Sequence, residues 1–426
     1  MLPLNGIATA MRGYDPAEPR QVLRLRSPTS RPEECDMAVV QEADDFDSAA
    51  SSGFVRALAV SDETALLTRA NGFPRIIQVP GKFGYLADGD VLGFHPASKR
   101  FRTLYRRSSA HNSFLVTERC NHYCLMCSQP PRDVDDSWIL REIRDAIPLV
   151  DKQTRSLGFT GGEPLLNWRG FMAILRDCRD ELPRTAVHVL SNGRAFASTE
   201  VVAAWTGIQH PSLTVGIPIY SAVDTVHDYV VQANGAFDET VLGILKLKNS
   251  GQRVEVRVVL HAITAQRIVA TCQWLARNLP FVDHVALMGL ENTGFAIANG
   301  KLLWIDPMDY REQLAEAVHV LAASKVRVSV YNLQRCVLAR SVWPYAVQSI
   351  SDWKNAYTAE CDNCDEKPRC GGFFTTGRAR YSRGIRAIRR SVASQTEKSL
   401  MLRFISGVVV GIVLGTAMTA LAAGVF

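Results

Sequence analysis

Apolar and polar positions change their rhythm near residue 113 of this chain. From there to about residue 330, short apolar runs alternate with longer segments whose apolar residues recur at helical spacing. Repeated strand–helix units predict a parallel sheet, with ligands gathered at the carboxyl ends of its strands. The apolar runs predict strands over residues 114–117, 156–160, 186–190, 213–220, 254–260 and 284–288. Helices are predicted over residues 137–150, 168–181, 236–249, 265–278 and 307–324.

About six such units, rather than the eight of a closed barrel, favour an α/β fold with a partial barrel over residues 111–330. Residues 1–53, by contrast, mix proline, arginine, aspartate, serine and alanine without periodicity. Such a segment buries little apolar surface, so we expect it to be disordered or loosely attached. Residues 54–110 carry short β-type runs between glycine-containing turns, which predict a small β-rich module leading into the barrel.

A largely apolar pattern covers residues 404–426, where no side chain is charged. At about 1.5 Å per residue, a helix of this length crosses a hydrocarbon core of about 30 Å. Residues 377–403 before it form a basic linker, and the positive-inside rule then predicts a C-terminal transmembrane helix in the inner membrane, with the catalytic part in the cytoplasm. Gly407, Gly411 and Gly415 give this helix a stripe of small residues, through which two copies could pair as a homodimer. A buried core helix is the alternative.

Charge and cysteine content narrow the function classes. The formal net charge of +6 arises in the basic linker, and the rest of the chain is roughly neutral, so a nucleic-acid surface is not expected. No secretory signal is visible at the N-terminus, and seven of the ten cysteines fall into two clusters with metal-like spacing. We therefore expect a reducing compartment, and metal ligands rather than disulfides.

The first cluster has Cys120, Cys124 and Cys127, separated by three and then two residues. Three thiolates can hold three irons of a [4Fe–4S] cube and leave the fourth iron without a protein ligand, which makes that iron a place for chemistry. A structural zinc site would want a fourth ligand, and neither a nearby cysteine nor a well-spaced histidine pair follows Cys127. The spacing therefore favours an iron–sulfur cluster.

With Gly161, Gly162, Glu163 and Pro164 at the end of the next predicted strand, this cluster resembles that of the radical S-adenosylmethionine (radical SAM) enzymes. The resemblance implies that SAM chelates the open iron and is cleaved reductively to a 5′-deoxyadenosyl radical, which abstracts a hydrogen from substrate. It also implies that Gly161 and Gly162 let the backbone approach the ligand, and that Glu163 balances the ammonium of SAM. Met126 stands where the family usually has an aromatic residue.

Three further positions are candidate SAM contacts. Ser191 and Asn192 match the place where the family contacts the ribose or methionine part of SAM, although an ordinary Asn-Gly turn also explains them. Arg257 lies on the predicted strand 254–260, where an inward arginine needs a carboxylate partner that SAM could supply. An outward, solvated Arg257 is the alternative.

The second cluster follows the predicted barrel, within residues 331–376. Cys361, Cys364 and Cys370, with Cys336 upstream, can form a four-cysteine site for zinc or for a second [4Fe–4S] cluster. Resemblance to radical SAM peptide-modifying enzymes, which often carry C-terminal auxiliary clusters, favours iron–sulfur. Four cysteines match the single-cluster version of that region.

Four segments together resemble the His-Xaa-Ser system radical SAM maturase family: residues 112–121, 124–131, 350–355 and 370–374. The likeness runs from about residue 55 to 375. It implies modification of a ribosomally made precursor peptide, and it identifies no catalytic residue. A cellular electron donor is the second expected partner, and membrane lipid is expected as a third because of the apolar residues 404–426. Two alternatives are a radical SAM enzyme acting on another protein or a small molecule, and a membrane iron–sulfur electron carrier without SAM chemistry.

Overall fold

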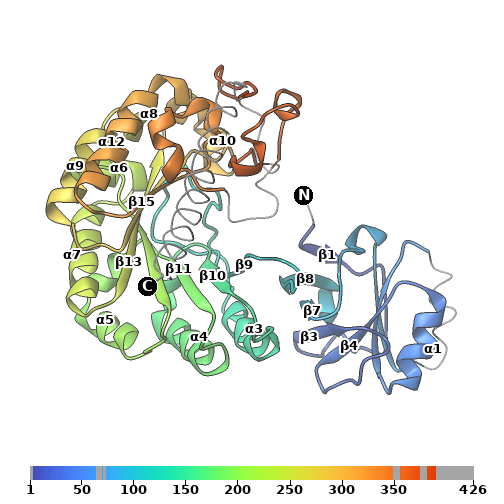
Figure 1. Ribbon diagram of the computed structural model, residues 1–426. Coiled ribbons are helices and arrows are strands. Elements are labelled where there is room, and N and C mark those ends of the chain that lie inside the picture. Colours follow the sequence, from blue (N-terminus) through green and yellow to red (C-terminus); the bar gives the residue numbers. More distant parts are fainter. Residues whose placement is uncertain (1–2, 64–69, 71–72, 349–355, 375–380, 390–426) are drawn as a thin grey trace, which may run out of the picture.

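Two sheets organise the chain. The structure is a computed structural model that describes residues 3–63, 70, 73–348, 356–374 and 381–389. An eight-stranded sheet occupies the N-terminal part, and a seven-stranded sheet follows it. Figure 1 shows them side by side, joined by the chain between β8 (Arg100–Tyr105) and β9 (Asn112–Leu115).

The eight-stranded sheet is closed by its first two strands. Only two residues separate β1 (Asn5–Ile7) from β2 (Ala10–Arg12), yet β1 pairs with β8 and β2 pairs with β6 (Arg75–Val79). Because these partners lie at opposite ends of the order β1-β8-β7-β3-β4-β5-β6-β2, the first strands join the two edges and make a small barrel. The other elements are β3 (Gln21–Arg26), β4 (Asp36–Val40), α1 (Ala43–Ser51), β5 (Arg56–Val60) and β7 (Val91–His95).

The prediction of disorder for residues 1–53 is therefore wrong. Its charged residues are paired within the fold: Arg24 Nε lies 2.8 Å from Asp36 Oδ1, and Asp36 is only 2% exposed. The acidic run after residue 41 belongs to α1, which buries Phe46 and Ala49 against the barrel. Strands of three residues are also too short for a periodic pattern to reveal. The β-rich unit thus begins near residue 5 rather than at residue 54.

The second sheet confirms the predicted parallel α/β fold. Its seven strands follow one another in sequence order from β9 to β15 (Val328–Tyr331), one strand more than the six predicted. Among the described strands β9 and β15 do not pair, so the barrel is open between these two edges. The strands between them are β10 (Ser156–Thr160), β11 (Ala186–Leu190), β12 (Leu213–Pro218), β13 (Arg253–Leu260) and β14 (His284–Gly289).

Side chains alternate between the two faces of this sheet. Along β13, Val254, Val256 and Val258 are buried in the main core, while Glu255 and Arg257 point to the opposite face. Burying each such valine contributes about 1.5–3 kcal/mol. We call the face that carries Glu255 and Arg257 the inner face. The apolar core lies on the other face, so the polar residues of the inner face must have another role.

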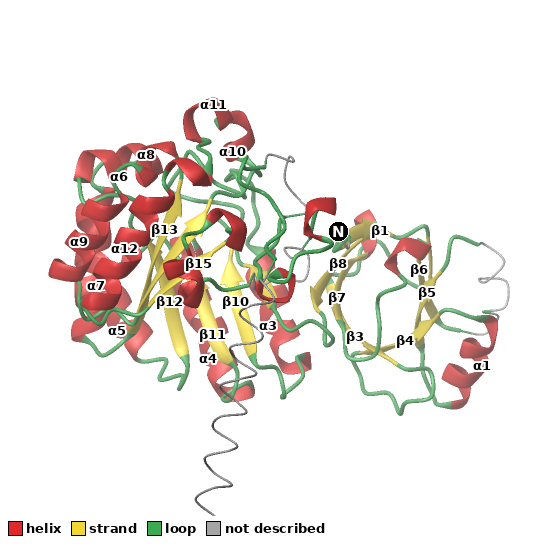
Figure 2. Cartoon of the chain, turned by 45° about the horizontal axis from the view of Figure 1, so that its top comes forward, coloured by secondary structure: helices red, strands yellow, loops and turns green. Residues whose placement is uncertain are grey.

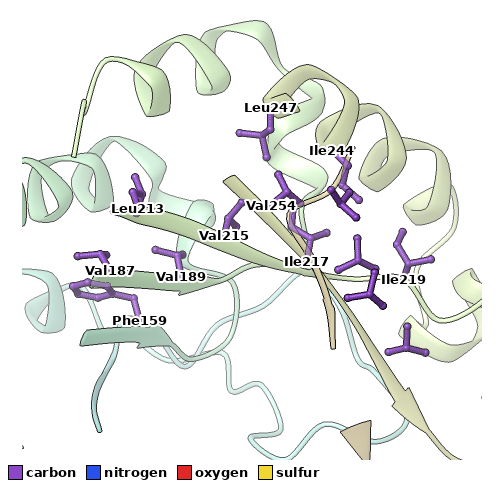
Figure 3. Close-up of a cluster of buried hydrophobic side chains, with 14 of the residues drawn as sticks. Phe159, Val187, Val189, Leu213, Val215, Ile217, Ile219, Ile244, Leu247 and Val254 are labelled. Carbon is purple, nitrogen blue, oxygen red and sulfur yellow. The ribbon is translucent and has the colours of Figure 1, made fainter. Parts of the chain in front are cut away.

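Helices cover the outer face. Figure 3 shows Ile244 and Leu247 of α7 (Ala236–Asn249) on the same side of the sheet as Val215 and Val254. Figure 2 shows that α8, α10 and α11 gather at the end where the strands finish. The helices besides α7 are α3 (Trp138–Ala146), α4 (Trp168–Glu181), α5 (Thr199–Thr206), α6 (Asp224–Val231), α8 (Ala262–Ala265), α9 (Ile268–Asn278), α10 (Phe295–Ala298), α11 (Gly300–Leu303) and α12 (Arg311–Ala323).

A buried carboxylate joins the two sheets. Glu142 of α3 is 2% exposed and forms an ion pair with Arg102 of β8. Gly93 of β7 makes room for it, because a Cβ there would lie 2.3 Å from Glu142 Oε1. Arg20 stacks over Trp138 of the same helix, with its guanidinium carbon 3.4 Å from the ring centroid. The first turns of α3 therefore dock the N-terminal barrel onto the open barrel.

The predicted transmembrane segment, residues 404–426, lies outside the described residues. Within the described ranges, no helix is both long enough and apolar enough to cross a membrane.

Candidate active site

The first three cysteines lie in the loop after β9, at the carboxyl end of an edge strand. This loop, residues 116–137, is called the cysteine loop, and its backbone is hydrogen-bonded to the loop after β10. Gly162 N donates to Thr117 O at 2.8 Å, and Glu163 N donates to Arg119 O at 2.8 Å. The two motifs singled out in the sequence therefore form one structural unit.

The glycines of the second motif are needed for this close approach. Gly161 has a φ of +137°, and a Cβ on it would lie 2.4 Å from Thr117 O. A Cβ on Gly162 would lie only 1.9 Å from Arg119 O. Both glycines thus let the backbone approach the cysteine loop, which is a structural reason for them beyond the ligand approach expected from the sequence.

Glu163 braces this unit against the loop after β11. Its Oε1 accepts hydrogen bonds from Leu165 N at 2.9 Å and Ser191 Oγ at 2.8 Å, and its Oε2 accepts one from Asn192 N at 2.6 Å. Glu163 is 2% exposed, and burial raises its pKa against the opposing effect of these hydrogen bonds. The structure thus brings Glu163, Ser191 and Asn192 together, and contact of any of them with SAM stays a prediction.

The loop after β11 also reaches the cysteines directly. Asn192 Nδ2 donates to Oδ1 of Asn121, the residue after the first cysteine, at 2.7 Å. Gly193 adopts a left-handed φ of +84°, so the Asn-Gly turn predicted as an alternative is present. Thr240 Oγ1 of α7 holds the same turn by donating to Asn192 O at 3.0 Å. Asn121 was not among the sequence candidates, although its place between two cysteines could have suggested it.

The far side of the cysteine loop rests on later segments. Leu125 N donates to Val230 O of α6 at 2.9 Å, and Phe295 N of α10 donates to Cys127 O at 2.9 Å. Asn299 Nδ2 donates to Leu125 O at 2.8 Å. The loop is thus fixed on both sides by backbone contacts that the sequence pattern did not reveal.

Tyr220 is a site residue that sequence reasoning missed. It is the second residue after β12 and packs with Met126 of the cysteine loop in one buried cluster. Burial raises the pKa of its phenol, and the nearby charges of Cys124 and Cys127 raise it further. An aromatic residue just after a strand of a parallel sheet is the signal that could have identified it.

The thiols fit the expected cluster by number and proximity. Burial raises the pKa of all three, that of Cys120 to about 11, and Cys127 also raises those of Cys120 and Cys124 through its charge. The three sulfurs therefore lie within electrostatic reach of one another. Each thiol must lose its proton to bind iron. Among the described residues, no three His, Cys, Asp or Glu side chains converge closely enough to hold a single metal ion. Three thiols in one loop are the donor set of a cube with one open iron.

Arg257 points inward, as the first of the two alternatives predicted. Its Nη1 lies 3.2 Å from Glu255 Oε1, so the chain itself supplies a carboxylate partner. Its Nη2 lies 3.1 Å from Met288 Sδ of β14. Sequence reasoning missed Glu255, although the alternation of β13 places it on the same face as Arg257.

The four cysteines of the second cluster are also brought together. Cys336 lies five residues after the end of β15, in the short helix Arg335–Val337. Burial raises the pKa of Cys336 and of Cys370, and the charge of Cys361 raises both further. Cys364 adds to the effect on Cys370. By donor type, four thiols suit either zinc or a cube, although no three of them converge closely enough among the described residues to hold a single metal ion.

Part of the predicted basic linker closes this region. Ile388 N donates to Cys364 Sγ at 3.3 Å, and Arg383 N donates to Asp306 Oδ2 at 3.0 Å. Asp306 precedes α12, so residues 381–389 are tied both to the cysteines and to the barrel. The prediction of a linker is wrong for these residues, because the segment is docked by these hydrogen bonds and Arg383 also forms an ion pair with Asp306. Residues 375–380 and 390–403, and the motif at 350–355, lie outside the described residues.

Comparison with known proteins gives one family and a set of distant folds. The family model described as the radical SAM superfamily matches residues 114–275. No curated protein matches the chain.

Among solved structures, SuiB of Streptococcus suis bound to precursor peptide SuiA is 13% identical with a TM-score of 0.41, covering 53% of this chain and 49% of that chain. A radical SAM methyltransferase from Sphaerobacter thermophilus is 16% identical with a TM-score of 0.42, covering 58% and 74%. Native anSMEcpe with bound AdoMet is 14% identical with a TM-score of 0.40, covering 51% and 62%. This chain spans about half the length of the SuiB structures it matches. The cysteine loop and strands β10 to β13 thus lie within residues 114–275, the part of the chain that matches the radical SAM superfamily.

Proposed function

We propose that this radical SAM enzyme modifies a ribosomally made precursor peptide, as a maturase of the His-Xaa-Ser type. One observation carries the proposal. The two edge strands of the open barrel, β9 and β15, are each followed, five residues after the strand ends, by the first cysteine of a cluster. A substrate that enters through the open side would meet both clusters. An extended peptide suits such an opening better than a small molecule, which a closed pocket would bury.

The chain's own residues have distinct tasks in this proposal. Cys120, Cys124 and Cys127 hold the first cluster, which when bound supplies the electron for reductive cleavage of SAM. Glu163 fixes the cysteine loop against the Ser191–Asn192 turn. These residues thereby set the place where SAM reacts before substrate arrives.

The second cysteine cluster would hold an auxiliary [4Fe–4S] group that engages the peptide or passes an electron. Its support is the donor set of four thiols at the second edge of the barrel. Measurement of metal content separates this proposal from zinc. Stoichiometric zinc in protein purified without added iron would remove the electron-transfer role.

The proposed place is the cytoplasmic face of the inner membrane. Its support is the apolar sequence of residues 404–426 behind a basic segment. If the segment spans, the full chain should fractionate with membranes and resist extraction by high salt, because burial of some twenty apolar residues outweighs screened attraction to anionic lipid. Release by salt alone would show that the basic residues hold it instead.

The decisive experiment uses the reconstituted full chain under anaerobic, reducing conditions. We expect 5′-deoxyadenosine to form from SAM, and a His-Xaa-Ser-repeat peptide encoded near this chain to change in mass only when the enzyme and SAM are both present. Deoxyadenosine without any change in the peptide would favour another protein or a small molecule as substrate. Absence of deoxyadenosine would favour an electron carrier.

A further inference from the structure

A polar network centred on Glu255 lies on the inner face of the sheet. Glu255 Oε2 accepts a hydrogen bond from His284 Nδ1 at 2.8 Å, while Oε1 lies 3.2 Å from Arg257 Nη1 and 3.5 Å from His188 Nε2. His284 Nε2 in turn lies 2.9 Å from Ser329 Oγ. The carboxylate requires a proton on Nδ1, and the two contacts together fix the orientation of this ring. One carboxylate of β13 is thus held from β11 and β14.

Gly216 makes this arrangement possible. It lies on β12, between the strands that carry His188 and Glu255. A Cβ on Gly216 would lie 3.0 Å from Arg257 Cδ and 3.1 Å from His188 Cε1. Both distances are shorter than ordinary van der Waals contact, so a side chain here would displace the arginine or the imidazole.

Arg257 keeps donors to spare within this network. A guanidinium has five N–H donors. Among the described residues, one Nη lies beside Glu255 and the other beside the thioether sulfur of Met288, a weak acceptor. Arg257 O accepts a hydrogen bond from Ile219 N at 3.0 Å, and the next residue, Tyr220, packs with Met126 of the cysteine loop, which places Arg257 toward the cysteine end of the inner face. Its remaining donors suit a planar anion such as a carboxylate.

We propose that Glu255 is a positioning residue that fixes the guanidinium of Arg257 for a carboxylate bound beside the cysteine loop, with His188 and His284 fixing Glu255 in turn. The inference rests on the proposed function, in which that carboxylate belongs to SAM or to the peptide. Arg257 is a long, flexible side chain, and holding it in place before the ligand arrives lowers the entropic cost of binding.

The test is a double-mutant cycle on the reconstituted full chain, with the dissociation constant of SAM measured by equilibrium dialysis without turnover. We expect Glu255→Ala to weaken SAM binding about tenfold, which is the cost of ordering one free side chain. Glu255→Gln keeps an acceptor and should lose about threefold. In an Arg257→Ala background, Glu255→Ala should cause no further loss, because Glu255 acts only through the arginine.

Controls separate positioning from general damage. Thr214 lies on β12, opposite His188 of β11, and Thr214→Ala should leave SAM binding unchanged. Thermal unfolding shows whether each variant is folded. If Glu255→Ala does not fold, the same comparison is made with Glu255→Gln. Decarboxylated SAM identifies the source of the carboxylate. If the carboxylate of SAM binds Arg257, Glu255→Ala should not change the affinity for decarboxylated SAM. If a carboxylate of the peptide binds Arg257, Glu255→Ala should instead raise the KM for peptide.

The proposal is overturned if Glu255→Ala weakens SAM binding equally in the presence and absence of Arg257, or if it changes neither SAM binding nor the KM for peptide. Failure of the proposed function would look different, because wild-type enzyme would then form no deoxyadenosine while still giving an interpretable binding cycle.

Discussion

Asn192 donates its side-chain amide to Asn121 Oδ1 at 2.7 Å and thereby joins the loop after β11 to the middle of the cysteine loop. The backbone N–H of Asn192 also donates to Oε2 of Glu163, which lies in the loop after β10. Three loops at the carboxyl ends of β9, β10 and β11 are therefore linked by hydrogen bonds. A change at any of the three is expected to reach the cysteines.

Replacing Asn192 by Ala should weaken SAM binding about fivefold, because loss of one such hydrogen bond costs about 1 kcal/mol. Iron content should stay the same, since no thiol is removed. Equilibrium dialysis with reconstituted protein measures the first and iron analysis the second. Asn278→Ala is a matched control, because the exposed side chain of Asn278 donates to Trp274 O of its own helix α9. Unchanged SAM binding in Asn192→Ala would show that the link to Asn121 has no role.

Replacing Gly162 by Ala should disrupt the cysteine loop. The added Cβ would lie 1.9 Å from Arg119 O, a backbone atom that cannot turn aside. Such overpacking costs about 1–3 kcal/mol, and we expect poor iron loading with it. Gly207→Ala serves as control, because Gly207 has a φ of −65° that alanine adopts without strain. Normal iron content in Gly162→Ala would contradict the close approach.

Alanine at Cys120, Cys124 and Cys127 together should abolish deoxyadenosine formation and lower the iron content by about four per chain. Each thiolate is one of three that hold the catalytic cube, so no partial activity is expected. Iron analysis and chromatography of the reaction products measure the two effects. Deoxyadenosine from the triple variant would refute the assignment.

The docked segment 381–389 predicts a difference between two truncations. A chain ending at Lys398 keeps the contact of Ile388 N with Cys364 Sγ and should retain about eight irons. A chain ending at residue 380 loses this contact and the pairing of Arg383 with Asp306, so it should hold about four. Cys361, Cys364 and Cys370 replaced together by alanine in the full chain should give about four as well. Equal iron in the two truncations would show that the segment does not close the second site.

The stability of the protein without clusters should depend on pH through Glu255. Burial opposes the ionisation of this group, but contacts with His188, His284 and Arg257 outweigh burial and lower its pKa below the ordinary value of 4.5. The ionised carboxylate therefore stabilises the fold above pH 4.5, and this contribution is lost as the pH falls below 4.5 toward the folded-state pKa. The difference in unfolding midpoint between wild type and Glu255→Gln should be largest near about pH 7 and shrink below about pH 4.5. A constant difference across this range would contradict the assignment.

The sequence by itself determined the parallel sheet and the chemistry of the first site. Four-to-eight-residue apolar runs separated by helical periods placed β10 and β11 at their observed bounds. The spacing of Cys120, Cys124 and Cys127 indicated an iron–sulfur cluster, because close thiolates in one loop are neighbours in any fold. Local patterns of this kind do not depend on distant contacts.

Tertiary structure alone decided the rest. The N-terminal barrel depends on pairing of β1 with β8 across about ninety residues, which no local pattern records. The same holds for the contact between residues 381–389 and the second cysteine cluster. The run of arginines in that segment had predicted a solvated linker. Glu255 and His188 meet only because Gly216 leaves the space between them. Polar side chains in the sequence look solvated until their partners are known, because the partner that makes burial favourable lies far away along the chain.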